Sequence, residues 1–331
     1  MLANVRWWAR AYPTIVVGVL AAMWAAHATG AESTYPTRSI RLIVASAPGG
    51  PNDLVARALA TPWSEMLGRA IVVDNRAGAA GVIATDIAAK ASPDGYTLLV
   101  GFQGPLVIAP NLTGTPYDTL KDFAPISLAV SSPFLLIVHP RVQAKSLKEL
   151  VALAKTRPGK MNFGSGGTGI GSHMTMELFK HISGTDIVHV PYKGAGPGLT
   201  ALIAGETDMM LAAVGAALPH VKADRLRAIA VGGDKRAASL PELPTFRESG
   251  YAIDASSWYG LVAPRSTPRA VLSKLHDTVV RVLNAPTLNT QLTNQGFNVA
   301  ASDPAQFGKL IREELATWGK VIDAAGLKGV R

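Results

Sequence analysis

The segment Phe163–His173 reads FGSGGTGIGSH and contains the spacing G-x-G-x-x-G between residues 164 and 169. It follows an apolar run typical of a strand and opens a helix, as the phosphate-binding turn of a dinucleotide enzyme does. The acidic residue that would bind the ribose is missing, because Tyr192 and Lys193 stand at the end of the next strand. We therefore interpret the turn as a helix start whose free N–H groups bind another anion.

Three further glycine-rich segments close apolar runs in a similar way. They are ASAPGGPND (residues 45–53), GFQGP (101–105) and PYKGAGP (191–197). Ligands of parallel α/β sheets bind at the carboxyl ends of strands, so the four loops are predicted to face one cleft. Their donors are backbone N–H, hydroxyl and amide groups, which suit a carboxylate, and Lys193 would add charge.

Each of these polar residues also has a plain structural interpretation. Asn52 or Asp53 could be the N-cap of the helix that they open, and Ser172 could cap its own helix. Lys193 could be an ordinary surface lysine. These alternatives stay open at the level of sequence.

Apolar strands alternate with amphipathic helices from Ile40 onward, and the same rhythm restarts after Ser146. Ser146 followed by Glu149 forms a capping box for the helix that begins there. The chain ends in helices, expected over residues 268–283, 284–294 and 304–325. The pattern predicts parallel sheets covered by helices, in an α/β protein of two lobes. Lobe 1 comprises residues 32–132 plus 258–331 and lobe 2 comprises 133–257, with crossings near Ser132 and Trp258.

The first 31 residues have the layout of a cleaved signal peptide. Arg6 and Arg10 precede an apolar run over residues 11–28, and small residues end the segment at Ala31. The alternative is a membrane anchor, since the run nears the length that crosses a bilayer. The chain has no cysteine, which excludes a lipoprotein anchor, disulfides and thiolate metal sites. These features predict a periplasmic protein that is not a lipoprotein.

Composition narrows the functional classes. The chain is 48% hydrophobic and 17% charged, as globular proteins are, and its net charge of +9 is spread without a dense basic run. Nucleic acid is therefore not expected as a partner. The seven histidines show no H-x-x-x-H or H-E-x-x-H metal spacing, and Ser172 and His173 are neighbours that point apart on a helix. Glu65, Glu313 and Glu314 are interpreted as solvated. We expect no catalytic residue, no metal and no cofactor.

Five segments in this order resemble one known family: YPTRSIRLIVASAPGGPNDLVAR, VVDNRAGAAGVIATDIAAKASPDGYTLLVG, NFGSGGTGIGSHMTMELFK, VPYKGAGPGLTALIAGETD and YGLVAPRSTP. They are similar to the Bug family of periplasmic solute-binding proteins, the extracytoplasmic receptors of tripartite tricarboxylate transporters. The resemblance runs from about Tyr35 to the C-terminus. It implies a type II periplasmic-binding-protein fold, in which two α/β lobes close on a small carboxylated ligand and present it to large and small membrane subunits.

The resemblance also implies which residues bind the ligand. By motif these are Ser46, Pro48, Gly49, Gly50, Asp53, Gln103, Gly104, Ser165, Gly166, Thr168, Ser172, Tyr192, Lys193, Gly194 and Asp208. Ser46 stands where members of the family often have an aromatic residue, which leaves the ligand's identity open. The ligand class spans di- and tricarboxylates, amino acids and aromatic acids.

Three alternatives to a monomeric transport receptor remain open at the level of sequence. The loaded protein could dock on a sensor kinase instead of a permease. It could bind a neutral or aromatic compound, since the first loop lacks its aromatic residue. It could be a periplasmic enzyme, although the chain has no G-x-S-x-G elbow and no S-x-x-K set.

Overall fold

A computed structural model describes residues 35–237, 239–324 and 326–329. The predicted signal peptide, residues 1–31, lies outside the described residues. By its internal contacts the chain divides into Met1–Thr37 and Arg38–Arg331, and every assigned strand and helix belongs to the second unit.

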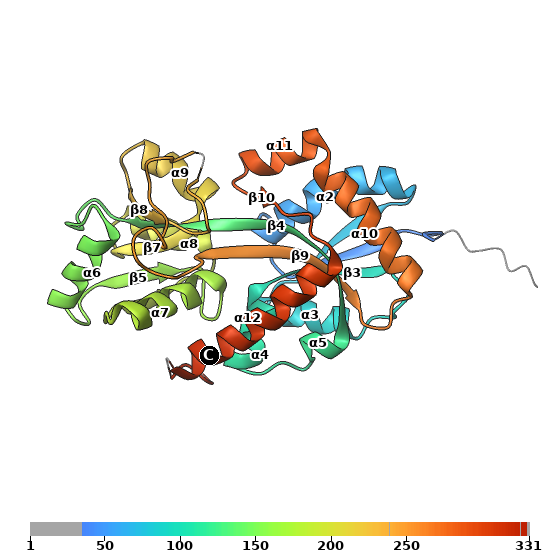
Figure 1. Cartoon of the computed structure of the whole chain (residues 1–331), viewed down its shortest axis with the longest axis horizontal. Coiled ribbons are helices and arrows are strands. Elements are labelled where there is room, and N and C mark those ends of the chain that lie inside the picture. Colours follow the sequence, from blue (N-terminus) through green and yellow to red (C-terminus); the bar gives the residue numbers. More distant parts are fainter. Residues whose placement is uncertain (1–34, 238, 325, 330–331) are drawn as a thin grey trace, which may run out of the picture. The chain divides into compact units, whose positions relative to one another are not determined.

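Ten strands are assigned in the described residues (Figure 1). They are β1 Ile40–Val44, β2 Ile71–Asn75, β3 Thr97–Phe102, β4 Phe123–Val138, β5 Asn162–Ser165, β6 Val188–Pro191, β7 Met209–Ala213, β8 Arg227–Val231, β9 Ser256–Pro264 and β10 Asn298–Val299.

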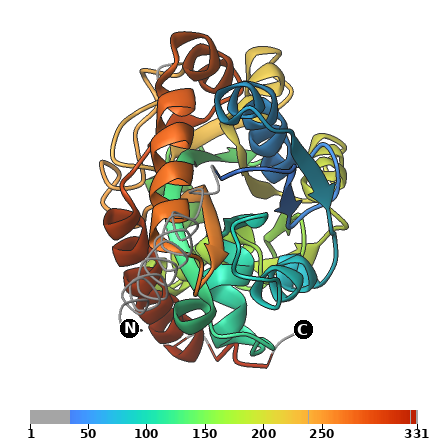
Figure 2. The same ribbon diagram turned by 90° about the vertical axis from the view of Figure 1, so that its right-hand side faces the viewer.

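The helices alternate with these strands and then complete the chain. They are α2 Pro51–Leu67, α3 Val82–Ala89, α4 Ala109–Leu112, α5 Thr119–Asp122, α6 Leu147–Thr156, α7 Gly171–Ser183, α8 Ala195–Ile203, α9 Val214–Lys222, α10 Arg269–Asn284, α11 Pro286–Asn294 and α12 Pro304–Ala324, with short turns η1 Ala79–Gly81 and η2 Gly104–Ile108. In the turned view of Figure 2 the C-terminal helices, orange to red, gather along one side.

The sheet has two parallel groups joined by antiparallel strands. In lobe 1, β1 pairs in parallel with β2 and β3, and β9 pairs antiparallel to β3. In lobe 2, β5 pairs in parallel with β6 and β7, while β4 pairs antiparallel to β7 and β8. The prediction of parallel sheets is therefore right for the strands that carry the loops and wrong for β4, β8 and β9.

The long strand β4 belongs to both groups. Its first part pairs with β9 from Phe123 to Pro133, and its second part pairs with β7 and β8 from Phe134 to Val138. Ser131 is the register partner of Trp258, so the two predicted crossing points lie side by side on adjacent strands. Figure 1 shows β4 and β9 running together between the two groups of helices.

Each lobe has its own apolar core. Phe163, Phe179 and Phe246 are fully buried in lobe 2, and Leu106 and Phe307 are fully buried in lobe 1. The two cores fix the strands whose ends carry the glycine-rich loops.

Ser146 caps α6 as predicted, but Glu149 bonds to the N–H of Lys145 and not to that of Ser146, as a strict capping box requires. Ser146 Oγ accepts a hydrogen bond from the Glu149 N–H at 3.2 Å, and Glu149 Oε2 accepts one from the Lys145 N–H at 2.8 Å. We expect Ser146→Ala to lower the free energy of unfolding by about 1 kcal/mol, because the Glu149 N–H loses its partner. Urea unfolding followed by circular dichroism measures this; Ser146→Asp, which keeps an acceptor, is the control. Equal stability of the alanine variant and the wild type would contradict the cap.

Candidate ligand-binding site

The loop after β1 is held by a network around Asp53. Asp53 accepts a hydrogen bond from the Gly49 N–H at 2.8 Å and pairs with Arg57 at 2.9 Å, while Asn75 Nδ2 donates to Ser46 O at 3.2 Å. Burial alone would raise the pKa of Asp53, but hydrogen bonds from Arg57, Gly49 and Asn75 outweigh it and hold this pKa below its usual range. Asp53 therefore stabilises the conformation of the loop after β1 through its bond to the Gly49 N–H.

Neither Asn52 nor Asp53 is the N-cap of α2. The N-cap position is Gly50, which offers no side chain, and Pro51 begins the helix. Both side chains lie in the first turn and are buried. The cap interpretation of these two residues is therefore wrong. Ser46 is half-buried, whereas Pro48 and Gly49 are exposed.

The loop after β3 packs tightly against a turn that the sequence did not single out. A Cβ at Gly104 would lie 2.6 Å from the Phe102 ring, and one at Gly81 would lie 3.1 Å from Ala45 O. Ala79 and Ala80 have positive φ angles in the same turn. The loops after β1, β2 and β3 thus meet at one edge of the lobe 1 sheet.

Gln103 is buried, with 4% of its surface exposed, and bonds to the C-terminal helix. Its Nε2 lies 3.3 and 3.2 Å from the two carboxylate oxygens of Glu314 in α12, and Trp318 Nε1 donates to the same carboxylate at 3.4 Å. Gln103 Oε1 is buried and has no hydrogen-bond partner among the described residues. The side chain is thus anchored at one end and unsatisfied at the other.

Glu314 is not the solvated residue that the sequence suggested. It is half-buried, while its neighbour Glu313 is exposed. Burial raises the pKa of the Glu314 carboxyl above its usual range, and the N–H groups of Trp258, Gln103 and Trp318 that face it offset part of this. The helix places one acid in solvent and the next against Gln103.

In lobe 2 the loops after β5 and β6 are bonded to each other. The Tyr192 N–H donates to Ser165 O at 2.9 Å, and the Gly194 N–H donates to Gly166 O at 3.1 Å. A Cβ at Gly166 would lie 2.8 Å from Ala195 N. Only glycine allows this approach of two backbones.

Three helices begin at these loops without a capping side chain. The N-cap positions are Gly50 for α2, Ile170 for α7 and Gly194 for α8. Ser172 lies inside the first turn of α7, so the prediction that it caps this helix is wrong. The first N–H groups of each helix have no partner within the helix and suit an anion.

The two lobes touch where α7 begins. A Cβ at Gly171 would lie 2.9 Å from Gln103 Oε1, and one at Gly169 would lie 3.0 Å from the Leu112 side chain. Met174, on the next turn of α7, is fully buried in the lobe 1 core. The Gln103 loop of lobe 1 and the glycine loop of lobe 2 therefore lie against each other.

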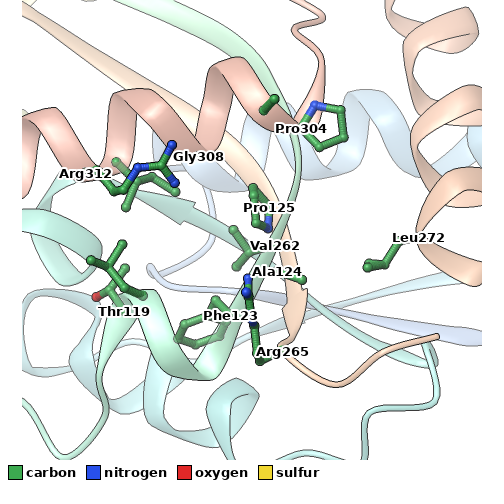
Figure 3. Close-up of a pocket in the computed structure, with 13 residues that line it drawn as sticks. Thr119, Phe123, Ala124, Pro125, Val262, Arg265, Leu272, Pro304, Gly308 and Arg312 are labelled. Atoms are coloured by element: carbon green, nitrogen blue, oxygen red, sulfur yellow. The ribbon is translucent and has the colours of Figure 1, made fainter. Parts of the chain in front are cut away.

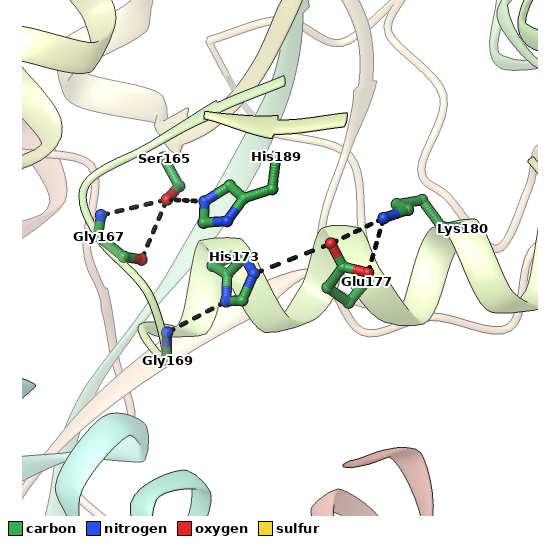
Figure 4. Close-up of polar contacts among 7 residues, drawn as sticks. All are labelled: Ser165, Gly167, Gly169, His173, Glu177, Lys180 and His189. Carbon is green, nitrogen blue, oxygen red and sulfur yellow. Dashed lines mark hydrogen bonds and ion pairs between the residues drawn. The ribbon is translucent and has the colours of Figure 1, made fainter. Parts of the chain in front are cut away.

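A stacked pair of histidines lies behind the glycine loop (Figure 4). The His173 and His189 rings are 3.9 Å apart between centroids, and Phe163 stacks on His189 at 4.8 Å. His173 Nδ1 accepts the Gly169 N–H at 3.1 Å. Burial, with the nearby charges of His189 and Lys180, lowers the pKa of His173 to about 3; burial, with Lys180, lowers the pKa of His189 to about 4. Both rings are neutral supports of the loop.

Ser165 and His189 form a close pair that the sequence pattern did not indicate. Ser165 Oγ lies 2.6 Å from His189 Nε2 and 3.0 Å from Gly167 O, and it accepts the Gly167 N–H at 3.1 Å. Ser165 is fully buried, and in the described part of the chain no carboxylate bonds to His189. The geometry is that of a loop brace, without the third group that orients a catalytic histidine.

One predicted residue, Asp208, lies apart from these contacts. Asp208 pairs with Arg141 at 2.8 Å and accepts the Asn162 N–H at 2.9 Å, which places it at the start of β5 and β7, opposite the glycine loop. Its predicted place near the cleft is therefore wrong. Lys193 is exposed, and Thr168 is half-buried in the glycine loop.

A hollow on the surface of lobe 1 lies away from the four loops (Figure 3). It measures about 400 Å³ and is lined by Phe123, Val262, Arg265 and Arg312 among others. Phe123 begins β4, Val262 lies near the end of β9 and Arg265 directly follows it, while Arg312 comes from α12; the hollow is thus at the amino end of β3. No predicted ligand residue lines it, and it is at the wrong end of the strands for the usual α/β site.

Membrane spans and metal clusters are both absent from residues 35–237, 239–324 and 326–329. None of the helices in these ranges has the length and apolar character to cross a membrane. No cluster of three or more histidine, aspartate or glutamate side chains suited to a metal ion occurs in them.

Comparison with known proteins bears on this geometry. Residues 55–327 match the family model described as tripartite tricarboxylate transporter family receptor. The chain is 34% identical to protein BugT of Bordetella pertussis over 316 residues, which cover 95% of this chain and 97% of that protein.

Two solved structures of Rhodopseudomonas palustris proteins are similar throughout. One, solved with adipate, has a TM-score of 0.81 at 33% identity and covers 88% of this chain and 98% of its own. The other, MatC with bound malate, has a TM-score of 0.78 at 32% identity and covers 87% and 100%.

Proposed function

This chain belongs to the receptor family of tripartite tricarboxylate transporters, and on that premise we propose that it captures a small carboxylated metabolite between its lobes for such a transporter. It has the two-lobed α/β fold of periplasmic solute-binding proteins. The resemblance seen in the sequence is confirmed. The ligand class and the residues that bind it are the proposal.

The observation that carries this proposal is the convergence of uncapped helix starts on the strand-end loops. Gly50, Ile170 and Gly194 leave the first N–H groups of α2, α7 and α8 without a side-chain partner at the cap. Such groups carry partial positive charge and favour a carboxylate. Adipate and malate, the acids in the two R. palustris structures, are of this class.

Capture proceeds by closure of the lobes. The ligand binds first to the loops of lobe 1, and α7 then closes over it and removes it from water. Closure changes the packing of Gly171 against Gln103, because these two residues join the loops of lobe 2 to those of lobe 1. The closed form is the one that the membrane subunits recognise.

The remaining parts of the proposal concern place and partners. The family consists of receptors, and we place this one in the periplasm as a monomer that docks on a large and a small membrane subunit. We assign it no catalytic activity, because the buried Ser165–His189 pair lacks an orienting acid in the described part of the chain. Residues 1–31 act as its export signal and are cleaved.

A thermal-shift screen of the protein from Glu32 onward tests the ligand class. At about 100 times its dissociation constant, the right acid is expected to add roughly 2.7 kcal/mol and raise Tm by several degrees. The panel holds mono-, di- and tricarboxylates, amino acids, aromatic acids and their neutral amides. Sodium chloride of equal ionic strength is the control. A shift with a neutral compound and with no acid would overturn the carboxylate assignment.

A further inference from the structure

Gln103 has its amide orientation fixed by chemistry. A carboxylate can only accept hydrogen bonds, and both oxygens of Glu314 lie within 3.3 Å of Gln103 Nε2. While Glu314 is ionised, the amide NH₂ therefore faces it, as in the structure. Its carbonyl oxygen, Oε1, points the other way, toward Gly171 at the start of α7.

The carbonyl end of this amide is buried and unsatisfied. Oε1 has no partner among the described residues, and Gln103 is only 4% exposed. Leaving a buried acceptor unpaired is unfavourable, because the group has given up its hydrogen bonds to water. Gly171 keeps a hydrogen where any side chain would crowd Oε1 at 2.9 Å. The unpaired acceptor thus lies where the loops of the two lobes meet, covered by the start of α7.

The Glu314 carboxylate, which bonds to Gln103, is itself unfavourable to bury. The Glu314 carboxylate is half-buried, and no cation pairs with it in the described residues. Its hydrogen bonds come from N–H donors, those of Gln103 and Trp318. Burial raises its pKa, so the fold bears a penalty for keeping an acid here. The adjacent Glu313 forms an exposed pair with Lys309 at 3.7 Å and makes no such contact.

We propose that Glu314 positions Gln103 so that its carbonyl oxygen selects acids carrying a hydrogen-bond donor, such as a hydroxyl, amino or amide group. This rests on the proposed function, and it narrows the ligand from carboxylates in general to hydroxy, amino or amide acids. Gln103 is the residue that touches the ligand, and Glu314 is a positioning residue that acts through it. An acid without a donor leaves Oε1 unpaired when the lobes close.

The test compares matched acids that differ only in the donor. Malate and aspartate are paired with succinate, lactate with propionate, and 3-hydroxybutyrate with butyrate, by isothermal titration calorimetry. The wild type is expected to bind the donor-bearing member of at least one pair tenfold or more tightly, because the analogue strands a buried acceptor.

Two variants separate positioning from simple damage. In Glu314→Gln the new amide can donate as well as accept, so Gln103 is free to turn over, and the affinity ratio within a pair should fall to about threefold or less. Gln103→Met removes the acceptor and should do the same. Glu313→Gln, which alters the exposed neighbour, should leave the ratio unchanged. A merely structural role of Glu314 would weaken both members equally and keep the ratio.

The outcomes distinguish the two proposals. Equal or tighter binding of the plain acids by the wild type overturns the selection and leaves the carboxylate receptor standing. An unchanged ratio in Glu314→Gln overturns the positioning role. Binding of neutral compounds alone overturns the proposed function, and the selection with it.

Discussion

Acidification from pH 7 to pH 4.5 is expected to lower the free energy of unfolding substantially through His173. The pKa of this residue is about 3 in the fold, against a value of 6.5 for an ordinary imidazole. Between these values the unfolded chain binds more protons than the folded one, so stability falls as the pH falls. At about 1.4 kcal/mol per pH unit, His173 alone costs on the order of 3 kcal/mol by pH 4.5. His189, with a pKa of about 4, acts in the same direction.

The charged groups around the rings support this sign. Lys180 lies near both histidines and opposes their protonation, and Glu177 pairs with Lys180 at 2.8 Å. Glu177 Oε1 is 3.8 Å from His173 Nε2, too far for a hydrogen bond. The stacked partner ring would repel a second charge. Glu177 would favour a protonated His173 through charge alone, and its own closer pairing with Lys180 limits that effect.

Urea unfolding at pH 7 and pH 4.5 measures the effect, with His173→Gln as the test variant. Glutamine cannot be protonated here, yet its carbonyl can accept the Gly169 N–H, so the variant should lose much less stability on acidification. His181→Gln changes an exposed histidine at the end of the same helix and serves as the control. If the wild type and His173→Gln had the same pH dependence, His173 would not be the source. Most carboxylates titrate below this window.

Local sequence pattern predicted most elements but missed the strand that joins the lobes. β4 contains Pro125 and Pro133, which normally argue against a strand interior. The register of β4 against β9 shifts at Pro125, and Pro133 stands at the last pair with β9. The antiparallel pairing depends on residues more than a hundred positions away. Short-range periodicity contains no information about such a partner.

In the candidate site, too, local features could be predicted from the sequence, whereas contacts between distant residues could not. The four glycine-rich loops could be predicted because turn chemistry at strand ends is local. The bond between Gln103 and Glu314 spans 211 positions, and nothing in the adjacent pair Glu313 and Glu314 says which one faces inward. The stacking of His173 on His189 likewise needs the placement of α7 against β6. Asp208 was misplaced because a motif gives a residue's neighbours and not the end of the strand on which it lies.

Gly166→Ala is expected to weaken acid binding on the order of a hundredfold, equal to about 2.7 kcal/mol. The new Cβ would lie 2.8 Å from Ala195 N and 3.1 Å from Gly194 C, which are backbone atoms that cannot turn aside. Moving them breaks the hydrogen bond from the Gly194 N–H to Gly166 O and shifts the start of α8. Both lobe 2 loops would then leave the positions from which their N–H groups meet a carboxylate.

Calorimetric titration with the acid that raises Tm most in the thermal-shift panel measures this loss. Gly196→Ala is the matched control, because Gly196 lies in the first turn of α8 and a Cβ there meets nothing within 4 Å. Far-ultraviolet circular dichroism should be unchanged in both variants, since neither glycine belongs to the lobe 2 core. Wild-type affinity in a folded Gly166→Ala protein would show that the ligand does not depend on the two lobe 2 loops, and the site would then rest on lobe 1 alone.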